Sequence, residues 1–64
     1  MSLYDYQQSK DLAYNNEFYA LLMAAMREAD DDNLIKLYSA FPETFTELQA
    51  RYNAPGGQLE GEST

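Results

Sequence analysis

Carboxylates in two parts of this sequence have a spacing that could support chemistry. The run from Asp30 to Asp32 is the kind of oxygen-rich segment that binds Ca²⁺ between two helices. Counted from Asp30 as the first ligand, the position that must be glycine holds Ile35 and the final bidentate position holds Phe41. We therefore predict no metal site here and interpret the run as a boundary between two helices, because Asp side chains cap helix N-termini.

The second pair of carboxylates is Glu43 and Glu47, which lie four residues apart and share one face of a helix. Two carboxyl groups can divide general acid and base catalysis between them. The sequence contains no histidine and no cysteine, so an imidazole base, a thiolate nucleophile and the usual zinc ligands are excluded. It also has no glycine-rich phosphate loop. We predict that the protein is not an enzyme and needs no cofactor.

Six tyrosines in 64 residues favour contact with another molecule, because tyrosine combines a large apolar ring with a polar tip and is enriched in interfaces. Three of them flank apolar helix faces and are expected at the edge of the core: Tyr19, Tyr38 and Tyr52. The other three belong to a weakly amphipathic N-terminal segment and are candidates for a contact surface: Tyr4, Tyr6 and Tyr14. A pairing of tyrosine rings with Lys10, Arg27 or Arg51 could also hold a small nucleotide, so a bound ligand stays an alternative.

The element that must position these side chains is a central helix. The run from Phe18 to Met26 is entirely apolar, and the helix is expected to span residues 17–29. At 100° per residue, one line along this helix suffices for a core: Phe18, Leu22, Ala25 and Ala29. The surplus apolar residues are Tyr19, Met23 and Met26, and we predict that they form a partner or self-association face. Methionine also fills gaps in cores, so a purely structural role is the alternative.

Local signals predict three further helices. Ser2 can cap the first of them, which is expected to be short and to span residues 4–14, with a break at Asn15 and Asn16. A third helix is expected over residues 33–40, and a fourth begins at Pro42 and ends at about residue 53. The sequence thus predicts an all-α protein: a small bundle of three main helices with a short N-terminal helix. Residues 1–54 form one domain, and residues 55–64 form a flexible, disordered tail.

The charge of the chain restricts its partners. Eleven acidic and four basic side chains give a net charge of −7, which repels nucleic acids and anionic membranes and attracts basic proteins. The sequence has neither a signal peptide nor an apolar stretch long enough to span a membrane, so we expect a cytoplasmic protein. A domain of this size has little surplus stability, and oligomerisation is one way to supply it.

Several segments together carry a resemblance to a known family: FYALLMAAMREAD at residues 18–30, KL at 36–37, AFP at 40–42 and ELQARYNAPGG at 47–57. In these segments the chain resembles a family of short proteins encoded by tailed bacteriophages and prophages. The similarity spans about residues 4–57. It carries no activity, ligand or functional residue, and implies only a viral setting, in which small acidic helical proteins often occupy the surface of a host protein.

These observations favour function by binding. Our leading hypothesis is a phage or prophage accessory protein that forms a homo-oligomer and binds and modulates a host protein, such as a defence protein, in the host cytoplasm. The alternatives are a purely structural protein that self-assembles, and an oligomer that sequesters a small ligand such as a nucleotide.

Overall fold

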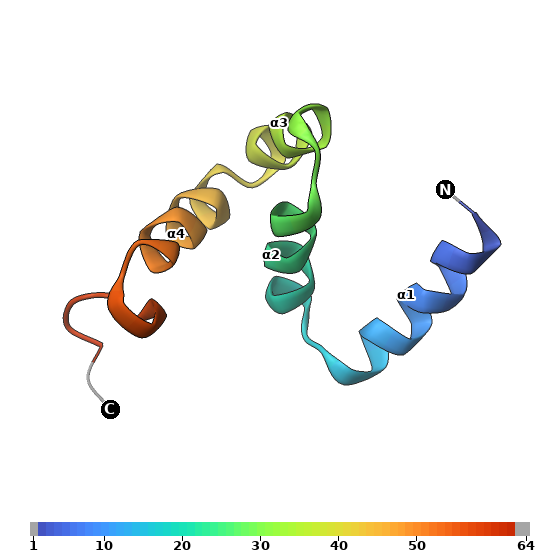
Figure 1. Cartoon of the computed structure of the whole chain (residues 1–64), viewed down its shortest axis with the longest axis horizontal. Coiled ribbons are helices and arrows are strands. Elements are labelled where there is room, and N and C mark those ends of the chain that lie inside the picture. Colours follow the sequence, from blue (N-terminus) through green and yellow to red (C-terminus); the bar gives the residue numbers. More distant parts are fainter. Residues whose placement is uncertain (1, 63–64) are drawn as a thin grey trace.

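Helices account for all of the regular structure in the computed structural model, which describes residues 2–62. The described residues are 79% helical, which confirms the predicted all-α class. Figure 1 shows the helices in chain order: α1 (Leu3–Asn15), α2 (Phe18–Glu28), α3 (Asp31–Ala40), α4 (Pro42–Tyr52) and the 3₁₀ turn η1 (Pro55–Gly57). The N-terminal helix, expected to be short, is 13 residues long.

The helices begin where the sequence supplies a cap. The backbone N–H of Asp5 donates to Ser2 Oγ at 3.1 Å, which closes the first turn of α1. At α3, Asn33 N–H donates to Asp30 Oδ1 at 2.8 Å. The helix therefore starts two residues earlier than expected, because Asp30 rather than a later residue is its N-cap. Pro42 occupies the first turn of α4, where its missing N–H leaves no helical hydrogen bond unmade.

The break between α1 and α2 falls at the predicted asparagines. Asn16 is extended, with φ −139°. Its Nδ2 donates to the carbonyl of Leu12 at 2.9 Å, and Asn15 Nδ2 donates to the carbonyl of Asp11 at 3.2 Å. The side chains thus satisfy carbonyls at the end of α1, and the extended residue turns the chain sharply into α2.

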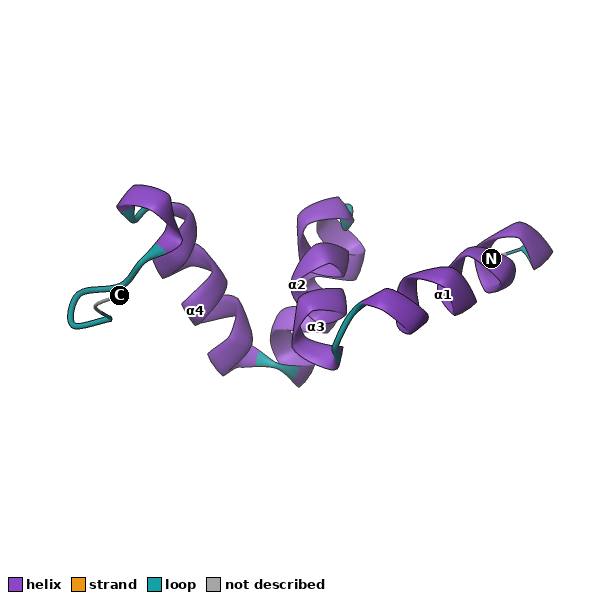
Figure 2. Cartoon of the chain, turned by 90° about the horizontal axis from the view of Figure 1, so that it is seen from below, coloured by secondary structure: helices purple, strands orange, loops and turns teal. Residues whose placement is uncertain are grey.

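The four helices divide into a body and an arm. Helices α2, α3 and α4 contact one another, whereas α1 touches only α2 and diverges from it, so that the two helices form a V (Figure 1). The view at right angles shows the same separation, with α1 extending away from α2 and α3 (Figure 2). The molecule measures 42 × 27 × 16 Å along its principal axes. We call α1 the arm.

The core is small and centres on α2. Leu22 and Met26 are 8% and 4% exposed, and α3 and α4 both contact α2. Leu34, Phe45 and Leu48 line a hollow together with Met26, and Leu37 and Phe41 are half-buried. The prediction that Met26 belongs to a partner face is therefore wrong, since it lies in the core. Phe18, expected inside, is 58% exposed. The buried direction on α2 is rotated by roughly 50° from the predicted line, because α3 and α4 both pack on the side of Met26.

The chain leaves an unusually large surface uncovered. Its accessible surface is 5608 Å², against about 4,200 Å² for a compact monomer of this mass. The radius of gyration is 13.6 Å, whereas a compact chain of this length has about 11 Å. The helices thus hold together, but a large part of their apolar surface has no cover within the chain. No helix in residues 2–62 is both long enough and apolar enough to cross a membrane.

Candidate protein interaction surface

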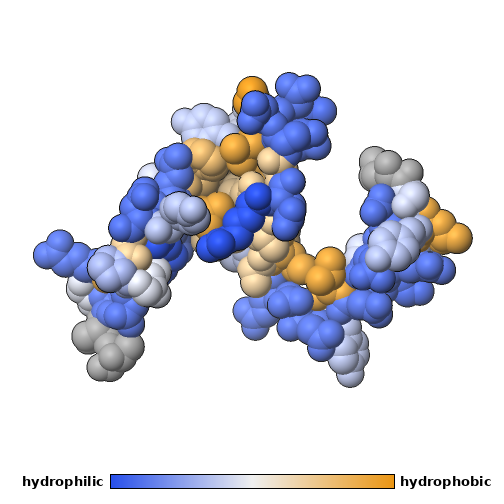
Figure 3. Space-filling model, viewed as in Figure 1, coloured by the Kyte–Doolittle hydropathy of each residue, from blue (hydrophilic) through white to orange (hydrophobic). Residues whose placement is uncertain are grey.

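A groove runs along the side of α2 that faces the arm. Near the base of the V it is a hollow of about 420 Å³ lined by Leu12, Asn16, Ala20, Leu21, Ala24, Ala25 and Glu28. Further along α2 it continues into a hollow of about 320 Å³ lined by Ala25, Glu28, Ala29, Asn33, Lys36 and Leu37. Both hollows share Ala25 and Glu28, so we treat them as one surface, the α2 groove. Figure 3 shows apolar residues in the angle between the arm and α2.

The α2 groove is open because of where its residues lie on the helix. Leu21 and Ala24 are roughly 140° and 160° around α2 from Met26. Since α3 and α4 pack mainly on the side of Met26, they leave the side of Ala24 open, while Leu21 is half-buried. The other end of the groove lies beside α3, whose Asn33, Lys36 and Leu37 line it. The groove therefore includes the side of α2 that is left over once the core has formed.

The arm carries a second uncovered apolar face. Leu3, Tyr6, Lys10 and Ala13 recur at spacings of three and four residues, and Tyr14 lies beside them; we call this set the α1 stripe. Its large apolar members are far from buried: Leu3 is 71%, Tyr6 63% and Tyr14 88% exposed. Lys10 Nζ lies 5.7 Å from the centre of the Tyr6 ring, a cation–π distance. Leu12 lies on the other side of the helix and lines the α2 groove.

The residues predicted for a partner face fall into three groups. Tyr4, Tyr6 and Tyr14 are exposed on the arm, and Tyr19 is 60% exposed at the start of α2, where its ring is 5.1 Å from that of Phe18. Met23 is half-buried and faces Glu43, Thr44 and Glu47 of α4, while Met26 is buried. The structure therefore does not bring the predicted set together on one surface.

Sequence reasoning missed the α2 groove as a surface: it placed Ala25 on the expected core line and did not assign Leu21 or Ala24 to a contact. A signal for Ala24 was present in the sequence, because the side of α2 opposite its expected core line has almost no polar side chain over its first turns. Alanines alone do not indicate a contact surface. Leu12 carried no signal, because it is a single leucine on the opposite side of the arm from the apolar stripe.

Tyr38 and Tyr52, which were expected at the edge of the core, are 48% and 74% exposed. The ring of Tyr38 packs edge-on against Phe45, with centroids 5.0 Å apart. Tyr52 lies at the rim of a hollow of about 470 Å³ between α2 and α4, lined by Met26, Arg27, Leu34, Phe45, Leu48, Gln49, Tyr52 and Asn53. This hollow has an apolar floor formed by the core, with Arg27 and Tyr52 among its lining residues.

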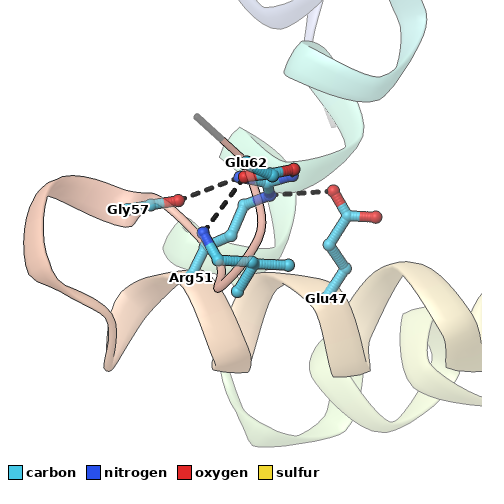
Figure 4. Close-up of polar contacts among 5 residues, drawn as sticks. Glu47, Arg51, Gly57 and Glu62 are labelled. Atoms are coloured by element: carbon cyan, nitrogen blue, oxygen red, sulfur yellow. Dashed lines mark hydrogen bonds and ion pairs between the residues drawn. The ribbon is translucent and has the colours of Figure 1, made fainter. Parts of the chain in front are cut away.

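A cluster of ion pairs joins the C-terminal segment to α4 (Figure 4). The Arg51 guanidinium donates to both carboxylate oxygens of Glu62, at 2.6 and 2.8 Å, and to Glu47 Oε2 at 2.9 Å. It also donates to the carbonyl of Gly57 at 2.9 Å. Glu62 Oε1 accepts a further bond from Leu59 N–H at 3.0 Å. We call these contacts the tail clasp.

The tail clasp orders part of the segment that was predicted to be a flexible tail. Residues 55–62 were expected to be a flexible tail, but they turn back on α4, with positive φ at Gly56 and Gly57, where glycine is favoured. The last two residues of the predicted tail, 63 and 64, lie outside the described residues. Hydrogen bonds from Arg51, and next the one from Leu59, lower the pKa of the Glu62 carboxyl below its ordinary value. Conversely, the hydrogen bonds that Arg51 donates to Glu62 and Glu47 raise the pKa of Arg51, which is charged in any case.

Two of the candidate carboxylates of the sequence have structural partners. Glu47 is paired with Arg51, and Asp30 caps α3. Over residues 2–62, no group of three or more potential metal ligands comes together.

Neither a protein-family model, a curated protein nor a solved structure matches this chain.

Proposed function

We propose that this protein acts without catalysis, by binding other protein chains. In its working state it is a homo-oligomer that engages and modulates a host protein in the cytoplasm of a bacterium, within the phage or prophage setting that the sequence resembles. The observation that carries the proposal is the large apolar surface that the single chain leaves uncovered, formed by the α2 groove and the α1 stripe.

The total surface of the chain also supports association. Polar and apolar surface together exceed the accessible surface of a compact monomer of equal mass by about 1,400 Å². A stable protein interface takes about 800 Å² from each partner, so the excess is large enough for one complete interface. Uncovered apolar patches of a few hundred Å² already distinguish interaction sites from ordinary surfaces.

Charge favours a basic partner for the rest of the surface. The net charge of −7 steers positively charged proteins toward the chain and disfavours nucleic acids. Exposed aromatic side chains outside the groove and the stripe, such as Tyr38 and Tyr52, supply the kind of residue that dominates binding energy in protein interfaces.

The test is capture of a partner from a bacterial lysate by the tagged chain, followed by mass spectrometry. Leu21→Glu introduces a charge into the α2 groove, and Ile35→Glu makes the same change on α3, where Ile35 is 62% exposed and lines no part of the groove. The wild type and Ile35→Glu are expected to retain one partner in a fixed ratio, and Leu21→Glu is expected to lose it. Equal capture by both variants would contradict a role for the groove.

A second candidate function is self-assembly alone, and the self-complementary placement of the two apolar faces favours it. In that case the tagged chain captures only further copies of itself. A third candidate, storage of a small anionic ligand, rests on the hollow beside Arg27, whose volume of about 470 Å³ falls in the range of ligand pockets. A rise in melting temperature with ATP that is absent in Arg27→Gln would support it.

A further inference from the structure

The two uncovered apolar faces cannot cover each other within one chain. Leu12, which lines the α2 groove, is roughly 150° around the arm from the centre of the α1 stripe. The stripe therefore points out of the V, away from the groove of its own chain. Both faces are apolar and both are open, so each needs a partner from outside.

From this geometry we infer that the occupant of the α2 groove is the arm of a second copy of the same chain. The α1 stripe of each copy lies in the α2 groove of the other, and a two-fold axis relates the two. The inference deepens the proposed function, because it names the partner that covers this groove.

The position of Leu12 fits this exchange. When two V-shaped molecules interlock, the arm of each copy lies between α1 and α2 of the other copy. The four helices then lie side by side in this order: α2 of the first copy, α1 of the second, α1 of the first and α2 of the second. Each arm then needs two contact sides: an outer one for the partner's α2 and an inner one for the partner's arm. The α1 stripe supplies the outer side and Leu12 supplies the inner one, on opposite sides of a single helix.

The lengths of the two surfaces agree. An arm of 13 residues is about 20 Å long, and α2 with its 11 residues spans about 16 Å before the groove continues onto α3. The exchange is reciprocal, so each copy loses surface at both its groove and its stripe. The total accessible surface of the chain, polar and apolar together, exceeds that of a compact monomer by about 1,400 Å², so it can lose the roughly 800 Å² that a stable dimer takes from each partner.

Charge complementarity supports the same pairing. Lys10 is the one cation of the α1 stripe and lies near its middle. Among the described residues that line the α2 groove, Glu28 carries the only negative charge and lies where the two hollows join, while Lys36 carries the only positive charge and lies in the hollow beside α3. In residues 2–62 neither Lys10 nor Glu28 forms an ion pair within the chain. Seating the stripe in the partner's groove brings Lys10 of one copy near Glu28 of the other.

The first experiment measures dimerisation of the full chain by sedimentation equilibrium. Tyr6→Asp places a charge on the stripe, whereas Tyr4→Asp makes the same change roughly 130° away around the arm. Both tyrosines are more than half exposed, so neither change disrupts the core. Tyr6→Asp is expected to raise the dimer dissociation constant by at least about tenfold and Tyr4→Asp by no more than about twofold. Equal effects of the two changes would overturn the inference.

The second experiment distinguishes exchange between chains from contact within one chain. In a homodimer of Lys10→Glu, residues 10 and 28 are both negative at each of the two symmetric contacts, and in a homodimer of Glu28→Lys they are both positive. Each variant alone is therefore expected to have a dimer dissociation constant about tenfold higher than that of the wild type. Mixing the two variants restores both opposite-charge contacts in a heterodimer, which native mass spectrometry identifies by mass. A mixture no more dimeric than its components would overturn the exchange.

These measurements also separate this inference from the proposed function. A chain that stays monomeric at high concentration, yet captures a foreign protein that Leu21→Glu loses, overturns the exchange and leaves binding of a host protein standing. If the two charge variants dimerise only when mixed, but the wild-type chain captures no other protein, the exchange is upheld and self-assembly is left as the function.

Discussion

At the residue scale, the two methionines of α2 differ in how far they are buried. Met23 and Met26 are three residues apart and of the same type, yet Met23 is half-buried beside α4 and Met26 is 4% exposed. Their difference arises from the side on which α3 and α4 pack, and it makes them a matched pair for measuring how much the small core contributes.

Met26→Ala is expected to lower the free energy of unfolding by about 2 kcal/mol or more, because it removes a buried side chain and leaves a cavity in a core with few other members. Met23→Ala is expected to cost less than about 1 kcal/mol. Urea unfolding followed by circular dichroism, at one fixed protein concentration, compares the two. A larger loss for Met23→Ala would mean that the core is centred elsewhere.

The tail clasp has a pH dependence whose sign follows from Glu62. Because Arg51 and Leu59 stabilise the charged carboxylate, its pKa lies below the ordinary value of 4.5, and the clasp is fully formed above that pH. As the pH falls through the lowered pKa, Glu62 becomes protonated, loses its ion pair and releases residues 58–62 from α4. NMR shifts of the Glu62 carboxyl carbon and the Leu59 amide are expected to change together in this acidic range.

Glu62→Gln is the control for this titration. It keeps the shape of the side chain but removes the charge, so the Leu59 amide is expected to show the released shift at every pH. A Leu59 shift that still follows pH in this variant would assign the titration to another group. Because all of these side chains are solvent-accessible, the helices themselves are expected to keep their circular dichroism throughout.

At the element scale, the helix boundaries depend on a few capping residues. Asp30 accepts a hydrogen bond from Asn33 N–H and determines where α3 starts, while Asp31 and Asp32 lie in its first turn, near the positive end of the helix dipole. The three adjacent aspartates therefore make different contributions despite their identical chemistry.

Asp30→Ala is expected to lower the stability of the protein by about 1 kcal/mol through loss of the cap. Asp32→Ala removes only a favourable interaction with the helix dipole and is expected to cost about 0.3 kcal/mol. Thermal unfolding monitored by circular dichroism measures both. Equal costs would show that the run acts through its total charge rather than through one hydrogen bond.

At the scale of the whole molecule, the dominant fact is the incomplete burial of apolar surface. Only Leu22 and Met26 are buried among the described residues, while the arm extends from a three-helix body. Such a chain gains stability when it associates, since binding that favours the folded state shifts the folding equilibrium.

The melting temperature is therefore expected to rise with protein concentration, as for any dimer whose folded state is stabilised by association. Tyr6→Asp, which weakens the arm contact, is expected to need at least about tenfold more protein than the wild type to reach the same rise in melting temperature. Differential scanning calorimetry over a wide concentration range makes the comparison. A wild-type melting temperature that does not change with concentration would show that folding and association are uncoupled.

The sequence by itself determined the features that depend on a few neighbouring residues. Ser2 and Pro42 mark helix starts because capping hydrogen bonds and the proline ring act over one turn of backbone, and the run from Asp30 to Asp32 marks a helix boundary without specifying which residue is the cap. The all-α class follows from the same local rules together with helical periodicity, and the absence of histidine and cysteine restricts the available chemistry before any fold is known.

Only the tertiary structure decided which side of α2 is buried. The apolar arc of α2 is wider than its core requires, so the sequence allowed several choices of core line, and the packing of α3 and α4 selected the one through Leu22 and Met26. The divergence of the arm depends likewise on the extended backbone at Asn16, a single torsional choice that helical propensity does not specify. The packing of α3 and α4 on one side of α2 and the extended backbone at Asn16 together left the α2 groove open. A helix that its own chain covers on one side exposes the apolar residues on its other side.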